Sequence, residues 1–235
     1  MNLNKILRWV ALGGIFLVPF VPLVVANNLF FPFITGKAFA FRILVMIATG
    51  AWLILALRDE DYRPKNSWIL KALAVFFVIV SLADIFSVNP FKSFWSNFER
   101  MEGWVAIFHL FLYFLVAGAM LDSWKLWKKF FQTSIVVSVI MAGYGIFQLA
   151  GFLVINQGGM RLDGTFGNAT YLAVYMLFHI FLTFFLLLRE RFSKFWQWTY
   201  GIIIALQLFT LYHTATRGVS LGLLGGILVT AILVA

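Results

Sequence analysis

Three short polar segments lie between apolar stretches, and each carries one arginine close to a glycine. They read Arg100-Met101-Glu102-Gly103, Arg161-Leu162-Asp163-Gly164 and Thr216-Arg217-Gly218. A glycine lets the backbone approach a ligand closely, and the N-terminus of a helix offers free N–H groups to an anion. Arginine adds a permanent charge and a planar fork that matches phosphate. The three segments are therefore predicted to be phosphate-binding elements on separate loops.

Each arginine also has a simpler interpretation, as a membrane-edge cation that reaches toward the headgroups or pairs with a nearby acid. Arg100 has Glu99 and Glu102 beside it, and Arg161 has Asp163 two residues away. Arg217 is harder to explain in this way, because its polar turn between two apolar stretches contains no acid.

The other residues with acid–base chemistry lie within or at the ends of apolar stretches. His213 precedes Arg217 by four residues, so the two would share a face if one helix continued through both. Histidine inside a membrane span is more often a hydrogen-bonded packing residue than a catalyst, and His109 and His179 fit that interpretation. Asp84 is a weaker candidate near the end of an apolar stretch. No ligand spacing for a metal is present.

Composition restricts the class of protein. The chain has 235 residues, of which 63% are hydrophobic and 11% charged, and its mean hydropathy is +0.95. A soluble domain carries about 25% charged residues, so a soluble enzyme, a disordered chain and a secreted disulfide scaffold are excluded. The absence of cysteine excludes disulfides and thiolate metal sites. The net charge of +9 is attributed to cations retained on the cytoplasmic side of a membrane, not to nucleic-acid binding.

The apolar stretches are each close to the length of about 20 residues that crosses a bilayer. They predict an all-α, polytopic bundle of about eight spans in a single transmembrane domain over residues 1–235. A signal peptide is the alternative for the first stretch, but its apolar run is long and more spans follow. The expected spans are Trp9–Leu29, Ala38–Leu57, Trp68–Phe86, Trp104–Leu121, Phe130–Ile155, Thr170–Leu188, Trp198–Ala215 and Gly218–Ala235.

The distribution of Lys and Arg predicts the orientation. With the N-terminus in the cytoplasm, 12 of the 18 Lys and Arg residues lie inside and 6 lie outside or near that edge. This satisfies the positive-inside rule and explains the inner cations as topology anchors. The arginine–glycine segments then fall on the outer face, where the rule does not account for their charge.

The outer segments resemble those of the O-antigen ligase and polymerase family. Residues 161–168, RLDGTFGN, resemble its "R…GTFGNPN" segment, and residues 216–223, TRGVSLGL, resemble its "SRGAxLGLxxG" segment. Arg100-Met101-Glu102-Gly103 resembles its "R.EG" loop, and Lys37 has a counterpart there. The chain departs from the pattern at Ala169 and Thr170, where the family often has Pro and Asn.

The resemblance implies a bacterial inner-membrane enzyme with its active face in the periplasm. Such enzymes transfer a glycan from an undecaprenyl-pyrophosphate carrier to a hydroxyl of lipid A-core, of a second glycan or of a protein. It further implies a metal-independent, inverting reaction without a cofactor. Arg161 and Arg217 are the catalytic residues that it implies, because fixed cations stabilise the charge that develops on the leaving pyrophosphate. The implied substrate-binding residues are Arg100, Lys37, Gly164, Asn168 and Gly218.

The family continues beyond the "SRG" helix with a large periplasmic loop and further spans, so we expect the 235-residue chain to be an incomplete transferase. Two other functions stay open. A multi-span transporter often shows internal repeats and intramembrane acids, whereas this sequence has no clear repeat and only Asp84 as a candidate acid. A non-catalytic scaffold of envelope assembly would leave the outer arginine–glycine segments unexplained.

Overall fold

The computed structural model describes residues 3–97, 101–157, 159–190 and 192–234, and the regular elements in these ranges are all helices. The chain divides into two compact units, residues 1–127 and 128–235. The expectation of one transmembrane domain over residues 1–235 stays a prediction.

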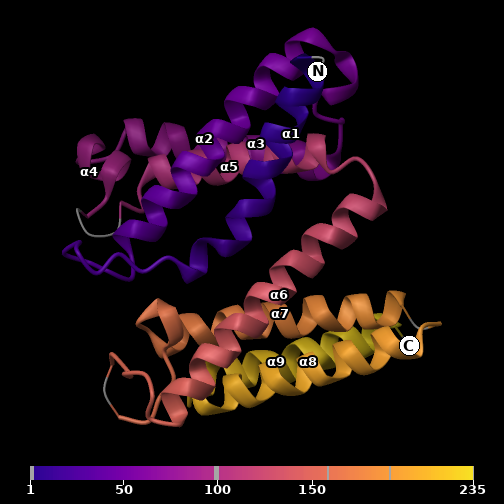
Figure 1. Ribbon diagram of the computed structural model, residues 1–235. Coiled ribbons are helices and arrows are strands. Elements are labelled where there is room, and N and C mark those ends of the chain that lie inside the picture. The colour runs from indigo at the N-terminus through magenta and orange to yellow at the C-terminus, as the bar shows by residue number, and fades with distance from the viewer. Residues whose placement is uncertain (1–2, 98–100, 158, 191, 235) are drawn as a thin grey trace. The chain divides into compact units, whose positions relative to one another are not determined.

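The first unit contains most of the helices (Figure 1). The long helix α6 begins at its end and continues into the second unit. The elements are α1 (Leu3–Leu17), the 3-10 helix η1 (Val18–Leu23), α2 (Thr35–Arg58), the 3-10 helix η2 (Glu60–Tyr62), α3 (Trp68–Ile85), α4 (Pro90–Trp95), α5 (Trp104–Met120) and α6 (Trp124–Leu149).

Local sequence explains where several of these helices begin and end. Pro19 and Pro22 lack a backbone N–H, and the chain changes from α-helix to 3-10 helix at Val18. The Ser67 hydroxyl accepts a hydrogen bond from the Leu70 N–H at the start of α3. The Asn89 side chain caps α4 in the same way, with Pro90 at the first helical position.

Helices α1 and α2 approach each other closely at Gly14. A Cβ atom at this position would lie 2.7 Å from the Ala48 Cβ and 3.2 Å from the Leu44 oxygen. Small residues allow such close approach between membrane helices. Further along the chain, α5 contacts both α2 and α3. Its Trp104 ring stacks on Phe94 and Phe108, and its indole N–H donates to the Ser81 hydroxyl of α3 at 2.7 Å.

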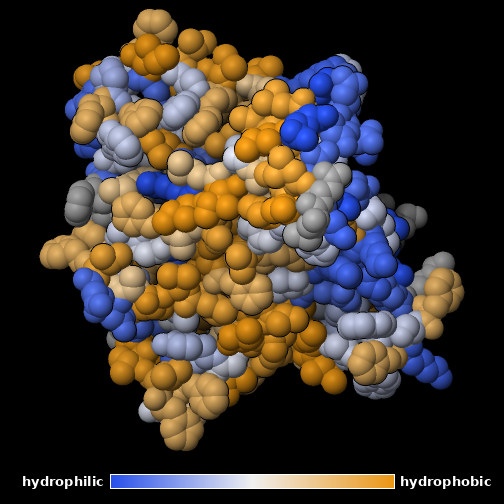
Figure 2. Space-filling view, turned by 45° about the horizontal axis from the view of Figure 1, so that its top comes forward, coloured by the Kyte–Doolittle hydropathy of each residue, from blue (hydrophilic) through white to orange (hydrophobic). Residues whose placement is uncertain are grey.

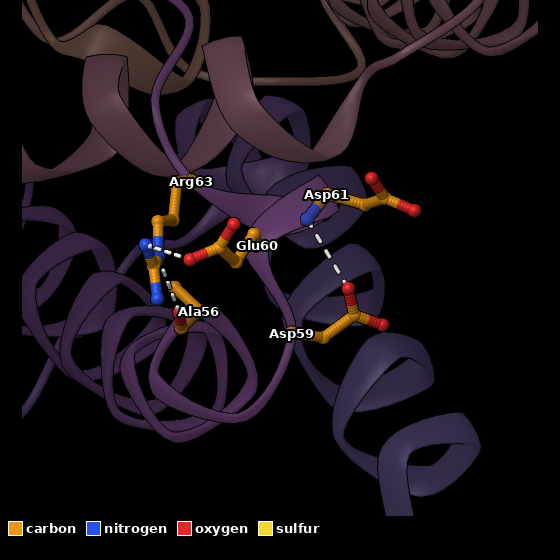
Figure 3. Close-up of polar contacts among 5 residues, drawn as sticks. All are labelled: Ala56, Asp59, Glu60, Asp61 and Arg63. Atoms are coloured by element: carbon orange, nitrogen blue, oxygen red, sulfur yellow. Dashed lines mark hydrogen bonds and ion pairs between the residues drawn. The ribbon is translucent and has the colours of Figure 1, made fainter.

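The turn between α2 and α3 is held by local polar contacts (Figure 3). Arg63 donates through Nη1 to Glu60 at 2.6 Å and through Nε to the Ala56 oxygen at 3.3 Å. The Asp59 carboxylate accepts from the Asp61 N–H at 3.1 Å. These contacts hold the turn without a ligand, and the role of this loop as a topology anchor stays a prediction.

The second unit consists of the rest of α6, the 3-10 helix η3 (Gly164–Phe166), α7 (Ala169–Arg189), α8 (Lys194–His213) and α9 (Arg217–Val234). Helix α7 lies alongside both α8 and α9 (Figure 1). Gly222 and Gly226 of α9 face Leu177 and Phe181 of α7, and a Cβ at Gly226 would overlap the Phe181 ring. The α7–α9 contact therefore also depends on glycine.

Buried polar side chains join α6, α7 and α8. Gln207 of α8, which is fully buried, donates to the Ser138 hydroxyl at 2.8 Å and bonds the Thr183 hydroxyl. The Ser134 hydroxyl bonds His179 Nε2 at 2.9 Å, and His179 Nδ1 bonds the Tyr175 oxygen. His179 is thus a hydrogen-bonded packing residue, as its position in the sequence indicates.

Within the described residues, five helical segments are long and apolar enough to cross a membrane. They are Leu3–Leu23, Thr35–Arg58, Trp68–Ile85, Trp124–Leu149 and Ala169–Arg189; α5 and residues 217–232 of α9 form shorter apolar helices. The prediction of an all-α protein is confirmed for the described residues, and five of its helical segments are candidates for membrane spans. The count of about eight spans and the orientation stay predictions. Hydrophobic side chains cover much of the surface seen in Figure 2.

Every expected span coincides with a helix, although several boundaries differ. The expected span Trp9–Leu29 is shifted, because the α-helix starts at Leu3 and the proline-containing η1 ends at Leu23. Helix α6 starts six residues before Phe130 and ends at Leu149, two residues before Gly151, whose φ of 77° no right-handed helix accommodates.

Candidate functional site

The loop between α6 and α7 is organised around the buried carboxylate of Asp163. This residue is fully buried, with 0% of its surface exposed. Its Oδ1 atom accepts a hydrogen bond from Gln148 Nε2 at 2.7 Å. Its Oδ2 atom accepts from the backbone N–H groups of Asn156, at 2.7 Å, and Gln157, at 3.0 Å. Three neutral N–H donors therefore hydrogen-bond the carboxylate, and a buried carboxylate needs such partners.

The amide of Gln148, at the end of α6, has a fixed orientation. Its oxygen accepts from the Gly164 N–H at 2.9 Å, and its nitrogen donates to Asp163 and to the Val154 oxygen. Gly164 is buried, with a φ of 56° that a residue with a side chain rarely adopts. The predicted substrate-binding role of Gly164 stays untested, and its observed role is to let the loop turn beside Met141 and Leu172.

Asn168 closes the loop and begins α7. Its side-chain oxygen accepts from the backbone N–H groups of Thr170 and Tyr171, at 2.9 and 3.3 Å. The Gln157 side chain accepts from the Ala169 N–H at 2.9 Å. Asn168 is therefore a helix N-cap, and its predicted contact with substrate stays a prediction.

Arg161 is exposed and directs its guanidinium to the turn between α8 and α9. Its Nε donates to the Thr214 oxygen at 3.0 Å, and its Nη2 donates to the Thr216 hydroxyl at 3.2 Å. The backbone adds a third bond, from the Leu162 N–H to the His213 oxygen at 3.1 Å. The structure thus brings two of the three predicted arginine–glycine segments together in the second unit. Asp163 does not pair with Arg161, although it lies two residues away.

Beside this turn lies an open cavity of about 710 Å³. Its polar wall comes from the turn and the first residues of α9, and its apolar wall comes from leucines further along α9. The lining residues include His213, Thr216, Arg217, Ser220, Leu221 and Leu224. A cavity with a cationic end and an apolar side suits an anionic group attached to a hydrocarbon chain.

Arg217 is the first residue of α9 and is exposed. It makes no hydrogen bond or ion pair with the residues that the structure describes. The unbonded backbone N–H groups of the first turn of α9 add positive potential at the same place. Arg217 is therefore the cation that the cavity offers to an anion. The neighbouring Gly218 is exposed, with open space around the position of a Cβ atom.

His213 is the last residue of α8 and lines the same cavity. The helix ends there, so the condition for sharing one helical face with Arg217 is not met; the two residues line one cavity across the turn instead. The Nδ1 atom of His213 lies 2.9 Å from the Phe209 oxygen. A carbonyl can only accept, so Nδ1 carries the proton of the neutral ring and Nε2 is left as an acceptor.

The remaining predicted residues belong to the first unit. Lys37, in the first turn of α2, donates to the backbone oxygens of Val24 at 2.7 Å and Phe33 at 3.1 Å. Arg42 is only 9% exposed and donates to the Met101 oxygen, so it fixes the segment that follows residues 98–100. Arg100 itself lies outside the described residues. The predicted substrate-binding roles of Lys37 and Arg100 stay predictions.

Sequence reasoning missed Gln148 and Ser220. Gln148 gave no signal, because a single amide near the end of an apolar stretch resembles any helix-terminal polar residue. Ser220 could have been found from its spacing, since it follows Arg217 by three residues and shares its helical face. The described residues contain no group of three or more His, Asp or Glu side chains that could hold a metal ion. The search against family models, curated proteins and solved structures found no match for this chain.

Proposed function

We propose that this chain acts in the transfer of a glycan from an undecaprenyl-pyrophosphate carrier to a hydroxyl acceptor, at the periplasmic face of a bacterial inner membrane. The observation that carries the proposal is the cavity beside the α8–α9 turn, where the exposed Arg217 is bound to no described residue. The resemblance of residues 161–168 and 216–223 to segments of the O-antigen ligase and polymerase family supports the same reaction.

The two walls of the cavity match the two parts of a lipid-linked donor. Arg217 and the free N–H groups in the first turn of α9 would bind the pyrophosphate, because they offer donors and positive charge. The Ser220 hydroxyl beside them donates to the Thr216 oxygen at 3.3 Å. Leu221 and Leu224 would contact the first isoprene units, because they continue the cavity along the apolar helix. In the reaction the acceptor oxygen bonds to the anomeric carbon, and the bond from that carbon to the pyrophosphate oxygen breaks. The leaving pyrophosphate keeps the electron pair.

Two side chains of the site have distinct tasks in this scheme. Arg217 stabilises the negative charge that grows on the departing pyrophosphate, which is a role for a fixed cation. His213 Nε2 takes the proton of the acceptor hydroxyl, since its Nδ1 proton is held by the Phe209 oxygen. Neither task requires a metal ion.

The test compares Arg217→Ala with the unmodified chain in vesicles. Both receive undecaprenyl-pyrophosphate-linked N-acetylglucosamine labelled in the sugar, and transfer of the label to a hydroxyl acceptor is followed by chromatography. Removal of one charge-stabilising group lowers turnover by about 10²- to 10³-fold, and we expect that loss for Arg217→Ala. Arg189→Ala is the matched control, because Arg189 ends α7 outside the cavity and contacts the Phe185 ring. Equal transfer by the unmodified chain and Arg217→Ala would overturn the proposal.

A further inference from the structure

The two arginines at the α8–α9 turn differ in what their guanidinium groups contact. Arg161 donates through Nε and Nη2 to the turn itself, at Thr214 and Thr216. It is not among the residues that line the cavity. Arg217 lines the cavity and contacts no described partner. The Arg161 side chain therefore faces the protein, whereas the Arg217 side chain faces the cavity.

Arg161 can hold the turn because the loop behind it is fixed. Asp163, two residues on, is fully buried and bonded to Gln148 and to two backbone N–H groups. The intervening Leu162 is also fully buried, and its N–H bonds the His213 oxygen. The turn needs such support, since its central residue, Ala215, has a φ of 50°, which a residue with a side chain adopts at a cost.

We infer that Arg161 is a positioning residue, which holds the α8–α9 turn so that Arg217 and His213 face the cavity, and that Arg217 alone of the two binds the anion. The inference rests on the proposed function and assigns separate roles to its two arginines. It depends on hydrogen-bond geometry, because the flat fork of an arginine reaches the Thr214 oxygen and the Thr216 hydroxyl together. A lysine keeps the charge but lacks this fork.

If Arg161 acts by holding the turn, a positive charge at position 161 is not sufficient for binding of the pyrophosphate. The probe is radiolabelled undecaprenyl pyrophosphate, and its affinity for the purified full chain is measured in detergent micelles. We expect Arg161→Lys and Arg161→Gln to weaken binding by similar factors, about tenfold, since both lose the bonds to the turn. A lysine in direct contact with phosphate would instead retain most of the affinity, because lysine is an effective phosphate binder.

A double-mutant cycle gives a second readout that a general loss of stability would not change. If Arg161 acts through the Thr216 hydroxyl, Arg161→Gln combined with Thr216→Val weakens binding less than the product of the two single effects. Salt dependence gives a third readout. Arg217→Gln removes a charge that faces the anion and flattens the loss of affinity with rising salt, whereas Arg161→Gln leaves that slope unchanged.

The matched control is Arg63→Lys. Arg63 also donates through Nε to a helical carbonyl and through a terminal nitrogen to a side chain, at a turn with no part in the proposed site (Figure 3). We expect its affinity for the probe to equal that of the unmodified chain. If Arg161→Lys binds within twofold of the unmodified chain while Arg217→Gln has lost binding, the positioning role is wrong and the proposed function stands. If Arg217→Gln binds normally, the proposed function itself fails.

Discussion

At the α6–α7 loop, two opposite charges lie two residues apart and do not pair. The Asp163 carboxylate turns into the protein toward amide donors, and the Arg161 guanidinium turns out toward the α8–α9 turn. Backbone N–H groups and an amide can stabilise a buried carboxylate without a second buried charge. Arg161 is therefore available to bond the turn. The loop is joined to the turn by the hydrogen bond from the Leu162 N–H to the His213 oxygen and by the Arg161 side chain.

Replacement of Asp163 by Asn tests this network. Asn has only one acceptor oxygen, so its amide nitrogen would face either Gln148 Nε2 or the N–H groups of Asn156 and Gln157. Gln148 cannot adjust by rotation, because its oxygen already accepts from the Gly164 N–H. We expect the free energy of unfolding to fall by about 1–3 kcal/mol, the cost of leaving buried polar groups unsatisfied.

Denaturation in detergent micelles, followed by circular dichroism, measures this loss. Asp59→Asn is the matched control, since the Asp59 carboxylate also accepts a backbone N–H, from Asp61, but at a solvent-accessible helix cap (Figure 3). Asn and Asp are nearly equivalent as helix caps, so this variant should unfold like the unmodified chain. Equal stability of both variants would show that the Asp163 network contributes nothing.

The sequence predicted which residues gather at this site better than it predicted their contacts. Residue type and glycine spacing pointed to Arg161 and Arg217; Arg217 directly follows the α8–α9 turn, and the Arg161 side chain bonds that turn from the α6–α7 loop. Proximity in sequence suggested an Arg161–Asp163 pair, whereas the carboxylate bonds Gln148, fifteen residues earlier in the chain. Short-range sequence patterns contain no information about which distant side chain reaches a buried group, so these contacts could not be predicted.

At the level of helices, close contacts depend on particular glycines rather than on glycine content. The neighbours Gly13 and Gly14 of α1 show this, because Gly14 faces α2 and Gly13 has open space around it. A methyl group at Gly14 would meet the Ala48 Cβ and the Leu44 carbonyl, and neither belongs to a flexible side chain that can move away. The two helices would have to separate.

We therefore expect opposite effects from the same substitution at adjacent positions. Gly14→Ala should lower the free energy of unfolding by about 1–3 kcal/mol, as overpacking does. Gly13→Ala should leave it unchanged or raise it by up to about 1 kcal/mol, because alanine favours the helix. The two variants are compared by thermal unfolding in the same detergent. A common effect on both positions would mean that helix propensity, not the α1–α2 contact, controls stability there.

The lengths of the apolar stretches in the sequence predicted all of the long helices. Helix α8 shows why stretch length alone does not determine which helices span a membrane. Helix α8 has 20 residues but does not reach the hydropathy of the five candidate spans. Its polar residues Gln207 and Thr210 are fully buried, and Gln207 bonds α6 and α7. Hydropathy averages over the circumference of a helix, so it does not distinguish a polar interior face from a polar surface.

At the scale of the molecule, the described ion pairs and the candidate site fall in segments expected on different sides of the membrane. Among the residues that the structure describes, three ion pairs lie in segments expected on the cytoplasmic side: Arg8 with Asp122, Arg63 with Glu60, and Lys128 with Glu190. On the expected outer side, Arg161 donates to neutral oxygens, and neither it nor Arg217 has an acidic partner among the described residues. Paired cations anchor a topology without attracting anions, whereas unpaired cations retain their attraction for anionic ligands. Arg217 therefore keeps its attraction for an anion at the candidate site.

The orientation of the chain in the membrane can be measured directly. The chain contains no cysteine, so each introduced cysteine reports on its own position. We expect Met160→Cys to react with a membrane-impermeant maleimide in spheroplasts, since Met160 is exposed in the loop of the candidate site. Asp61→Cys and Lys194→Cys should react only after the membrane is permeabilised. If α3, α5 and α6 each cross the membrane, as the sequence predicts, Asp61 and Met160 lie on opposite sides. If Met160→Cys were protected and Asp61→Cys labelled, Arg217 would face the cytoplasm and the proposed periplasmic transfer could not occur there.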